Sequence, residues 1–102
     1  MPKSLTVHAQ KELRAIHGHS RRLNRLLKKE HARALLDMME DHIAEIKECH
    51  GKGDKHYLIE TGDLIILSLE LIKEARSSPD IVLSKCYPRF HKKLLGLIKD
   101  LN

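Results

Sequence analysis

The run from Tyr57 to Ile72 constrains the fold most, because it has the length of a helix and is apolar on nearly every side. Its leucine and isoleucine side chains, placed about 100° apart per residue, spread over most of the helix circumference. Acids of this run and its continuation share one arc of roughly 80°: Glu60, Asp63, Glu70 and Glu74, the acidic stripe. This stripe is either the only solvent-exposed face of the helix or a set of carboxylates pointing into a pocket.

Composition places the chain among folded all-α proteins. The 102 residues are 41% hydrophobic, 32% charged and only 3% aromatic, which fits one domain over residues 1–102 with an aliphatic core built by helices. The run at 57–72 is shorter than the roughly 20 apolar residues that a bilayer span requires, and it contains three acids. We therefore expect no membrane segment.

Hydrophobic periodicity predicts four amphipathic helices. Apolar residues recur at helical spacing from about 4 to 29 and from about 32 to 50. A third helix should run from an N-cap at Asp54 to about residue 76, and Ser77-Ser-Pro-Asp80 should open a fourth. Pro88 should kink or split that fourth helix, because proline lacks a backbone donor. Short connections favour an antiparallel four-helix bundle with the third helix at its centre.

Two further expectations follow from this pattern. Gly51-Lys-Gly-Asp54 should form the hinge after the second helix, because glycine readily adopts the left-handed conformation that ends helices. If the other helices of one subunit do not cover the third helix, a second subunit must do so. We therefore expect a homo-oligomer.

The spacing of acids on both sides of the hinge suggests a metal site. Glu60 and Asp63 are three residues apart, so they lie on the same helix face and can share a cation. Mg²⁺ prefers oxygen ligands and commonly uses a few carboxylates with water and phosphate. In the second helix the candidates to complete the site are the acid pairs Glu45 and Glu48, Asp41 and Glu45, and Asp37 and Glu40. On the helix, His42 and Glu45 border the apolar face, whereas Glu48 points away from it.

This arrangement resembles the MazG-like group of all-α nucleoside triphosphate pyrophosphohydrolases. The matching residues, within about 35–75, are Asp41-His42-Ile-Ala-Glu45, Gly53-Asp54 in the hinge, and Glu60-Thr-Gly-Asp63-Leu-Ile. The resemblance implies that Glu45, Glu60 and Asp63 hold Mg²⁺, with Mn²⁺ as an alternative. The metal would bridge a triphosphate and activate water, releasing pyrophosphate and a nucleoside monophosphate.

The first carboxylate of the family motif falls on His42 in this alignment. Asp41 or His42 would then complete the site, and Asp37 with Glu40 form an alternative acidic pair. The triphosphate would meet basic residues of the first helix, or Lys92 and Lys93.

A basic block in the first helix supports a different hypothesis, a non-catalytic binding module. Its cations could neutralise nucleic-acid phosphates; they are Arg21, Arg22, Arg25, Lys28 and Lys29. No aromatic residues interleave with the block for base stacking. A helical bundle that docks a protein partner is the other form of this alternative.

Cysteine and histidine carry weaker signals. Cys49 and Cys86 are expected to be reduced thiols, because residues 1–30 contain no signal-peptide pattern and the protein is expected to be cytoplasmic. Cys49, His50 and His56 surround the hinge and could form a zinc site with His42, but their spacings follow no established zinc pattern. The remaining histidines are expected to face solvent.

Overall fold

The computed structural model describes residues 6–102 and consists of four helices there, without a strand. They are α1 (Val7–Leu26), α2 (His31–Gly51), α3 (Tyr57–Glu74) and α4 (Pro79–Leu101). The predicted all-α, four-helix fold is confirmed, although the predicted start near Ser4 lies outside the described residues. Within residues 6–102, no helix combines the length and the apolarity needed to cross a membrane.

Side chains cap three of the four helices. Thr6 Oγ1 accepts a hydrogen bond from the N–H of Ala9 at 3.0 Å, and the Glu30 carboxylate accepts from the N–H groups of Ala32 and Arg33. Ser78 Oγ caps α4 and is followed by a proline in the first turn, as predicted. Each bond satisfies an N–H group that has no partner within its helix.

The hinge between α2 and α3 confirms one sequence prediction and corrects another. Gly53 has φ 71°, the left-handed conformation expected where α2 ends. The residue that precedes α3 is His56 and not Asp54. Asp54 instead accepts a hydrogen bond from the His56 N–H at 2.9 Å, so its side chain stabilises the turn before the helix. In α4, the helix continues through Pro88; a kink at this residue stays a prediction.

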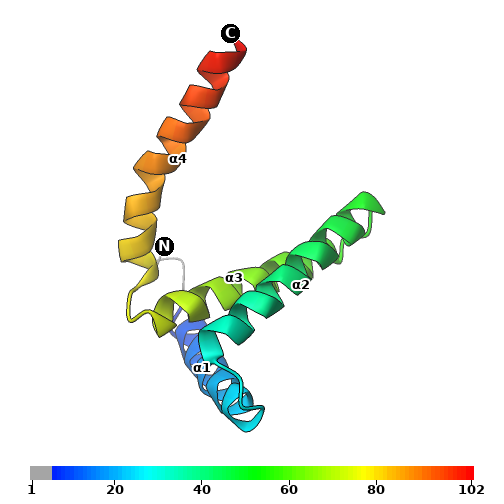
Figure 1. The fold of residues 1–102 in the computed structure, drawn as a ribbon, viewed down its shortest axis with the longest axis vertical. Helices are drawn as coiled ribbons and strands as arrows, with labels where there is room; N and C mark the ends of the chain where they lie inside the picture. Colours follow the sequence, from blue (N-terminus) through cyan, green and yellow to red (C-terminus); the bar gives the residue numbers. More distant parts are fainter. Residues whose placement is uncertain (1–5) are drawn as a thin grey trace.

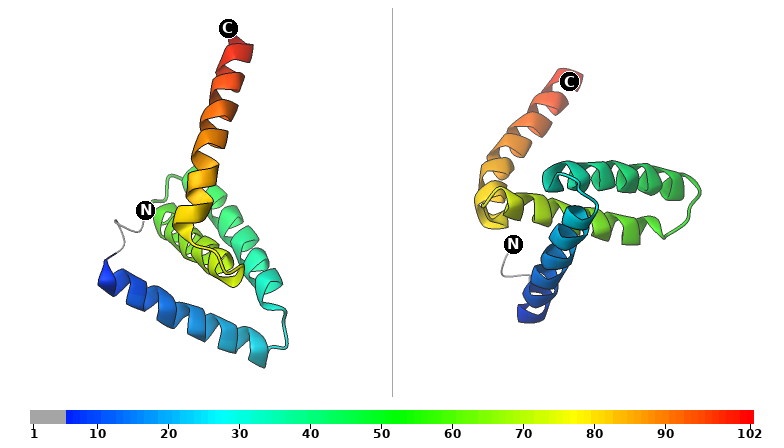
Figure 2. Two further views of the ribbon diagram at one scale, coloured as in Figure 1. Left: turned by 90° about the vertical axis from the view of Figure 1, so that its left-hand side faces the viewer. Right: turned by 60° about the horizontal axis from the view of Figure 1, so that its bottom comes forward.

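The helices α2 and α3 form an antiparallel hairpin, and α1 crosses it at the end where α2 begins and α3 finishes (Figures 1 and 2). After a short connection, α4 extends away from the other three helices (Figure 1). The molecule is consequently elongated, with principal extents of 53 × 35 × 27 Å.

The hydrophobic core is small. Ala34, Leu35 and Leu67 are the fully buried apolar residues within 6–102, and Leu35 alone has no exposed surface. Many other large apolar side chains remain exposed, including Leu58 and Ile65 of α3. Such a core provides limited stabilisation, so polar contacts between helices contribute a larger share of the stability of the fold.

Candidate metal centre

Three acids of the acidic stripe face the other helices, whereas the fourth, Asp63, is 45% exposed, so the stripe as a whole is not the solvent-exposed face of α3. The exposed fractions of the side chains are 5% for Glu70, 13% for Glu60 and 26% for Glu74. Leu58 and Ile65, on the opposite side of α3, are more than half exposed. The buried face of α3 thus carries carboxylates, while much of its apolar face meets solvent.

Each acid of the stripe lies near a histidine. Glu60 Oε1 is 2.8 Å from His42 Nδ1, and Asp63 Oδ2 is 4.0 Å from the same nitrogen. Glu70 Oε1 is 3.7 Å from His17 Nδ1. Glu74 Oε2 is 3.9 Å from His31 Nε2. The expectation that histidines other than those at the hinge face solvent is therefore wrong for His17 and His31, which lie between helices.

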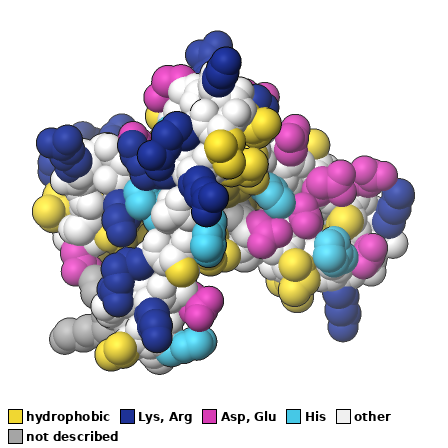
Figure 3. Space-filling model, turned by 90° about the horizontal axis from the view of Figure 1, so that it is seen from below, with side chains coloured by type: hydrophobic (Ala, Val, Ile, Leu, Met, Phe, Trp, Pro, Cys, Tyr) yellow, Lys and Arg dark blue, Asp and Glu magenta, His cyan; other side chains and the backbone are white. Residues whose placement is uncertain are grey.

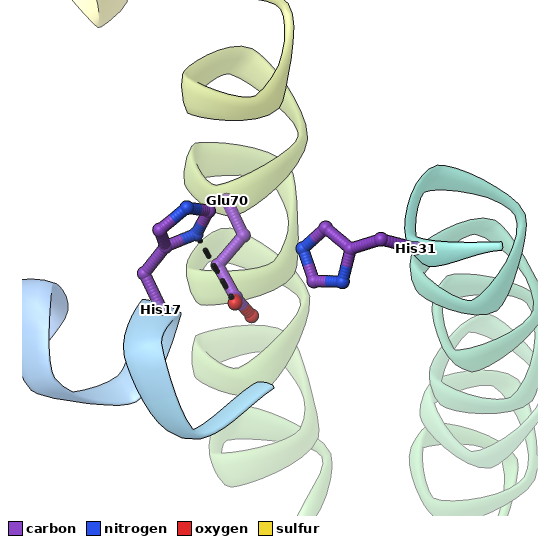
Figure 4. Close-up of side chains that lie close together, drawn as sticks. All are labelled: His17, His31 and Glu70. Atoms are coloured by element: carbon purple, nitrogen blue, oxygen red, sulfur yellow. Dashed lines mark ion pairs between the residues drawn. The ribbon is translucent and has the colours of Figure 1, made fainter. Parts of the chain in front are cut away.

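Three of these side chains converge from three different helices. His17 of α1 and His31 of α2 lie on either side of Glu70 of α3 (Figure 4). One donor atom from each residue lies within 4.8 Å of the other two. The two imidazole rings meet edge to face, with centroids 5.7 Å apart. We call this group the three-helix cluster.

The polar atoms of the three-helix cluster lack hydrogen-bond partners. Within residues 6–102, the buried side-chain nitrogen or oxygen atoms without a partner are His17 Nδ1, His31 Nε2 and Glu70 Oε1. A buried polar atom without a partner costs about 1–3 kcal/mol, so such atoms are rare in folded proteins. Here all three point toward one another, which is the arrangement expected of ligands around a cation.

Asn24 contacts His31 at the ring nitrogen that does not belong to the three-helix cluster. The side chain of Asn24 is only 4% exposed, and its Nδ2 atom lies 2.8 Å from Nδ1 of His31. A ligating histidine commonly donates its second ring N–H to an oxygen that fixes its orientation. Metal binding through Nε2 of His31 would require the Asn24 amide to be turned by 180°, so that its oxygen accepts the Nδ1 proton and Nε2 is free of a proton.

Electrostatics favour the neutral form of His17. Burial lowers the pKa of His17 below its usual value, and the nearby Lys73 ammonium lowers it further, while Glu70 acts in the opposite direction. The imidazole of His17 is therefore neutral at neutral pH. This is the form that binds metal ions.

An ion pair borders the cluster on the α1–α3 side. Arg21 of α1 donates a hydrogen bond to Glu74 of α3, and this bond holds the pKa of Glu74 below its usual value. Because His17, Arg21 and Asn24 recur at helical spacing, one polar face of α1 meets Glu70 and Glu74 of α3.

A surface pocket of about 350 Å³ reaches the cluster from one side. His17 and Glu70 contribute to its wall, and Arg14 and Lys73 place positive charge there. The pocket approaches the cluster from this side, while the three donor atoms themselves are buried.

The structure brings together three of the residues that the sequence analysis named as metal ligands. His42, Glu60 and Asp63 form a second group of donor atoms within 4.8 Å of one another, as expected from their spacing. Asp41 and Glu45 are exposed on α2 and do not join this group. The Nδ1 atom of His42 is already hydrogen bonded to Glu60, and His56 Nε2 lies 3.5 Å from the other oxygen of Glu60.

The other predicted contacts are spread over the surface. Lys92 and Lys93 are exposed on the part of α4 that extends away from the hairpin (Figure 1). In the basic block, Arg21 is paired with Glu74, whereas the other members are exposed: Arg22, Arg25, Lys28 and Lys29. Figure 3 shows lysine and arginine side chains gathered at the left and centre of one face and acidic side chains gathered at its right.

The hinge residues considered for zinc do not form a third group. Among residues 6–102, Cys49 and His50 belong to no cluster of three donors, and His50 instead packs edge to face against Tyr57. Burial raises the pKa of the Cys49 thiol, with Asp54 adding to the rise, so this thiol is less readily ionised for metal binding.

Sequence reasoning missed His17, His31 and Asn24 as site residues. For His17 and Asn24, the sequence feature that could have indicated a site is the polar face of α1, on which residues 17, 21 and 24 follow one another at intervals of four and three. This face complements the acidic stripe, but the partners are 53 residues apart in the chain for Arg21 and Glu74. Only the crossing of α1 over the hairpin brings them together.

No family model, curated protein or solved structure matches this chain. The likeness of residues 35–75 to the MazG-like group consequently stays a hypothesis.

Proposed function

We propose that this protein binds a divalent first-row transition metal ion through His17, His31 and Glu70. The observation that carries the proposal is the convergence of three buried donor atoms that have no hydrogen-bond partner. Two imidazoles and one carboxylate form a ligand set suited to Zn²⁺ or Fe²⁺, whereas Mg²⁺ favours oxygen alone.

The spacing of the donor atoms supports this fit. Bonds of 2.0–2.2 Å around Zn²⁺ put neighbouring ligand atoms about 3.3 Å apart. The pair His17 Nδ1 and Glu70 Oε1 is 3.7 Å apart, and the whole group lies within 4.8 Å. Closure on the order of 1 Å is within reach of side-chain rotation, and Asn24 supports the orientation of His31.

Three protein ligands leave a coordination position for water or a substrate atom. A zinc ion held by His17, His31 and Glu70 would supply Lewis-acid chemistry to a bound water or substrate oxygen at neutral pH. Arg14 and Lys73 line the pocket beside His17 and Glu70, so an anionic ligand fits the approach to this position.

The test is metal binding by competition with a chromophoric chelator. Wild-type protein is expected to take up one Zn²⁺ per chain, and His17→Ala, His31→Ala and Glu70→Gln should each weaken this uptake. His19→Ala is the matched control, because His19 is exposed two residues from His17. Equal uptake by wild type and all three variants would refute the proposal.

The second candidate function is Mg²⁺-dependent hydrolysis of a nucleoside triphosphate to a monophosphate and pyrophosphate. It is favoured by the grouping of His42, Glu60 and Asp63, with Asp41, Glu45, Lys92 and Lys93 as its other proposed participants. In this hypothesis Asp63→Asn abolishes pyrophosphate release and His17→Ala leaves it unchanged. If Asp63→Asn protein still released pyrophosphate at the wild-type rate, this second hypothesis would be refuted.

A further inference from the structure

The fourth helix has an apolar face that nothing else in residues 6–102 covers. Within α4 no residue is fully buried, and side chains recurring at three- and four-residue spacing are at least half exposed. They are Tyr87, Phe90, Leu94, Leu97, Ile98 and Leu101. A continuous apolar stripe of this kind marks an interaction surface.

The hairpin has a complementary uncovered face. Leu36 and Ile43 of α2 are exposed by 45% and 43%. They are on the side of α2 opposite to that which meets α1, as judged from their helical positions. Ile65, exposed by 57%, is on the side of α3 turned away from Glu70. One more helix laid along this face would complete a four-helix bundle.

We propose that the uncovered hairpin face is occupied by α4 of a second copy of this chain, and that the exchange is reciprocal. The connection after α3 directs α4 away from its own hairpin (Figures 1 and 2). Helix lengths match, because α4 has 23 residues and α2 has 21, about 35 Å and 32 Å.

Charge favours this occupant. Between Lys85 and Lys99, α4 has five lysine or arginine residues and no acid. Between Asp37 and Glu48, α2 has five acids and one lysine. By helical position, Glu40 and Lys93 border the two apolar faces, and the other acids of α2 and the other basic residues of α4 lie farther round each helix. A second copy therefore brings an acid and a base to the edge of the interface twice in a symmetric dimer.

The buried area is sufficient for a stable dimer. Each of the six side chains of the α4 stripe offers on the order of 100 Å², so two helices contribute about 1,200 Å². The hairpin faces beneath them bury a comparable area. The total exceeds the roughly 1,600 Å² of a standard specific interface.

One pair of residues allows the exchange to be tested directly. Glu40 is one helical turn from both Leu36 and Ile43, at the edge of the hairpin face. Lys93 is one turn from both Phe90 and Leu97, and its Nζ lies 5.9 Å from the Phe90 ring centroid. In the exchanged dimer, each of these charges lies at the border of the same interface.

The experiment measures molar mass by light scattering and sedimentation over a micromolar concentration series. Wild-type protein is expected to be a dimer. Phe90→Asp should weaken it by more than about 100-fold, and Glu40→Lys or Lys93→Glu alone by roughly tenfold. Helix content by circular dichroism controls for folding. This proposal is independent of metal binding, so each can fail alone.

Mixing the two charge variants gives the decisive result. A dimer of Glu40→Lys with Lys93→Glu chains has opposite charges at both contacts, so the mixture should recover wild-type association. A contact formed within one chain is not repaired by mixing. A monomeric wild type, a dimer indifferent to Phe90→Asp, or no recovery on mixing would overturn the proposal.

Discussion

Glu70 of α3 places its Oε1 atom 3.7 Å from Nδ1 of His17 in α1, and neither atom has a hydrogen-bond partner. The side chain of Glu70 is 5% exposed and that of His17 is 14% exposed. The His31 ring from α2 completes a group in which each helix provides one donor. The contacts among α1, α2 and α3 thus include buried polar groups without partners, beside the apolar core of Ala34, Leu35 and Leu67.

Replacing Asn24 should change metal affinity without removing a ligand. Asn24→Ala removes the group that orients His31, and we expect Zn²⁺ affinity to fall by roughly 10–100-fold. Asn24→Asp supplies a carboxylate oxygen that accepts the Nδ1 proton of His31, so affinity should match or exceed that of the wild type. Competition titration against a zinc chelator measures the Zn²⁺ affinities of the wild type and the two variants. If the alanine and aspartate variants bind alike, Asn24 does not orient His31.

Zinc should raise the thermal stability of the protein, because an ion that binds only the folded state stabilises it by mass action. At a free concentration 100 times the dissociation constant, the gain is about 2.7 kcal/mol. For a domain of this size the gain corresponds to a rise in Tm of roughly 10–20 °C. Thermal denaturation followed by circular dichroism, with and without zinc and then with a chelator, measures it. A rise that persists in Glu70→Gln would assign the stabilising ion to another site.

The Arg21–Glu74 ion pair should contribute modestly to stability above pH 4.5. The folded-state pKa of Glu74 is lowered, chiefly by the hydrogen bond from Arg21, so the unfolded state takes up its proton first as pH falls. The contribution is present above the unfolded pKa and is lost as pH falls through the folded pKa. Arg21 is 49% exposed, so Arg21→Gln should cost no more than about 1 kcal/mol.

Urea denaturation of wild type and Arg21→Gln at pH 7 and at pH 3 measures this contribution. The difference between the two proteins should shrink at pH 3. Arg22→Gln is the control, because Arg22 is the exposed neighbour of Arg21. A difference that grows at pH 3 would contradict the account.

Cys49 should react slowly with alkylating reagents at mildly alkaline pH. Burial and the nearby Asp54 raise the pKa of its thiol, and the thiolate is the reactive form. Asp54→Asn removes part of this effect and should accelerate alkylation at pH 8, as measured by mass spectrometry of the Cys49 peptide. Lys55→Gln is the control beside it. A rate unchanged by Asp54→Asn would mean that Asp54 does not influence the thiol.

The sequence predicted the helices well because their determinants are local. Apolar residues at helical spacing indicated all four helices, and Gly53 and Ser78 indicated two of the helix ends. Asp54 was a less reliable signal, since an aspartate stabilises a turn before a helix as readily as it caps one.

The site was harder to predict because its geometry is not local. The spacing of Glu60 and Asp63 correctly placed them on one face of α3, and His42 lies beside them. Nothing in the sequence indicated that Glu70 would meet His17, since that contact depends on the angle at which α1 crosses the hairpin. A stripe of acids along an apolar helix has the same pattern whether it faces water or histidines.

The most direct test of the account is calorimetric titration of Zn²⁺ into wild type, Glu70→Gln and Asp63→Asn proteins. We expect one zinc ion bound per wild-type chain, and zinc binding unchanged in Asp63→Asn. In Glu70→Gln the loss should exceed the roughly 10–100-fold that follows from losing an orienting partner. Absence of zinc binding in the wild type, or equal binding by wild type and Glu70→Gln, would contradict the assignment of the three-helix cluster as a metal site.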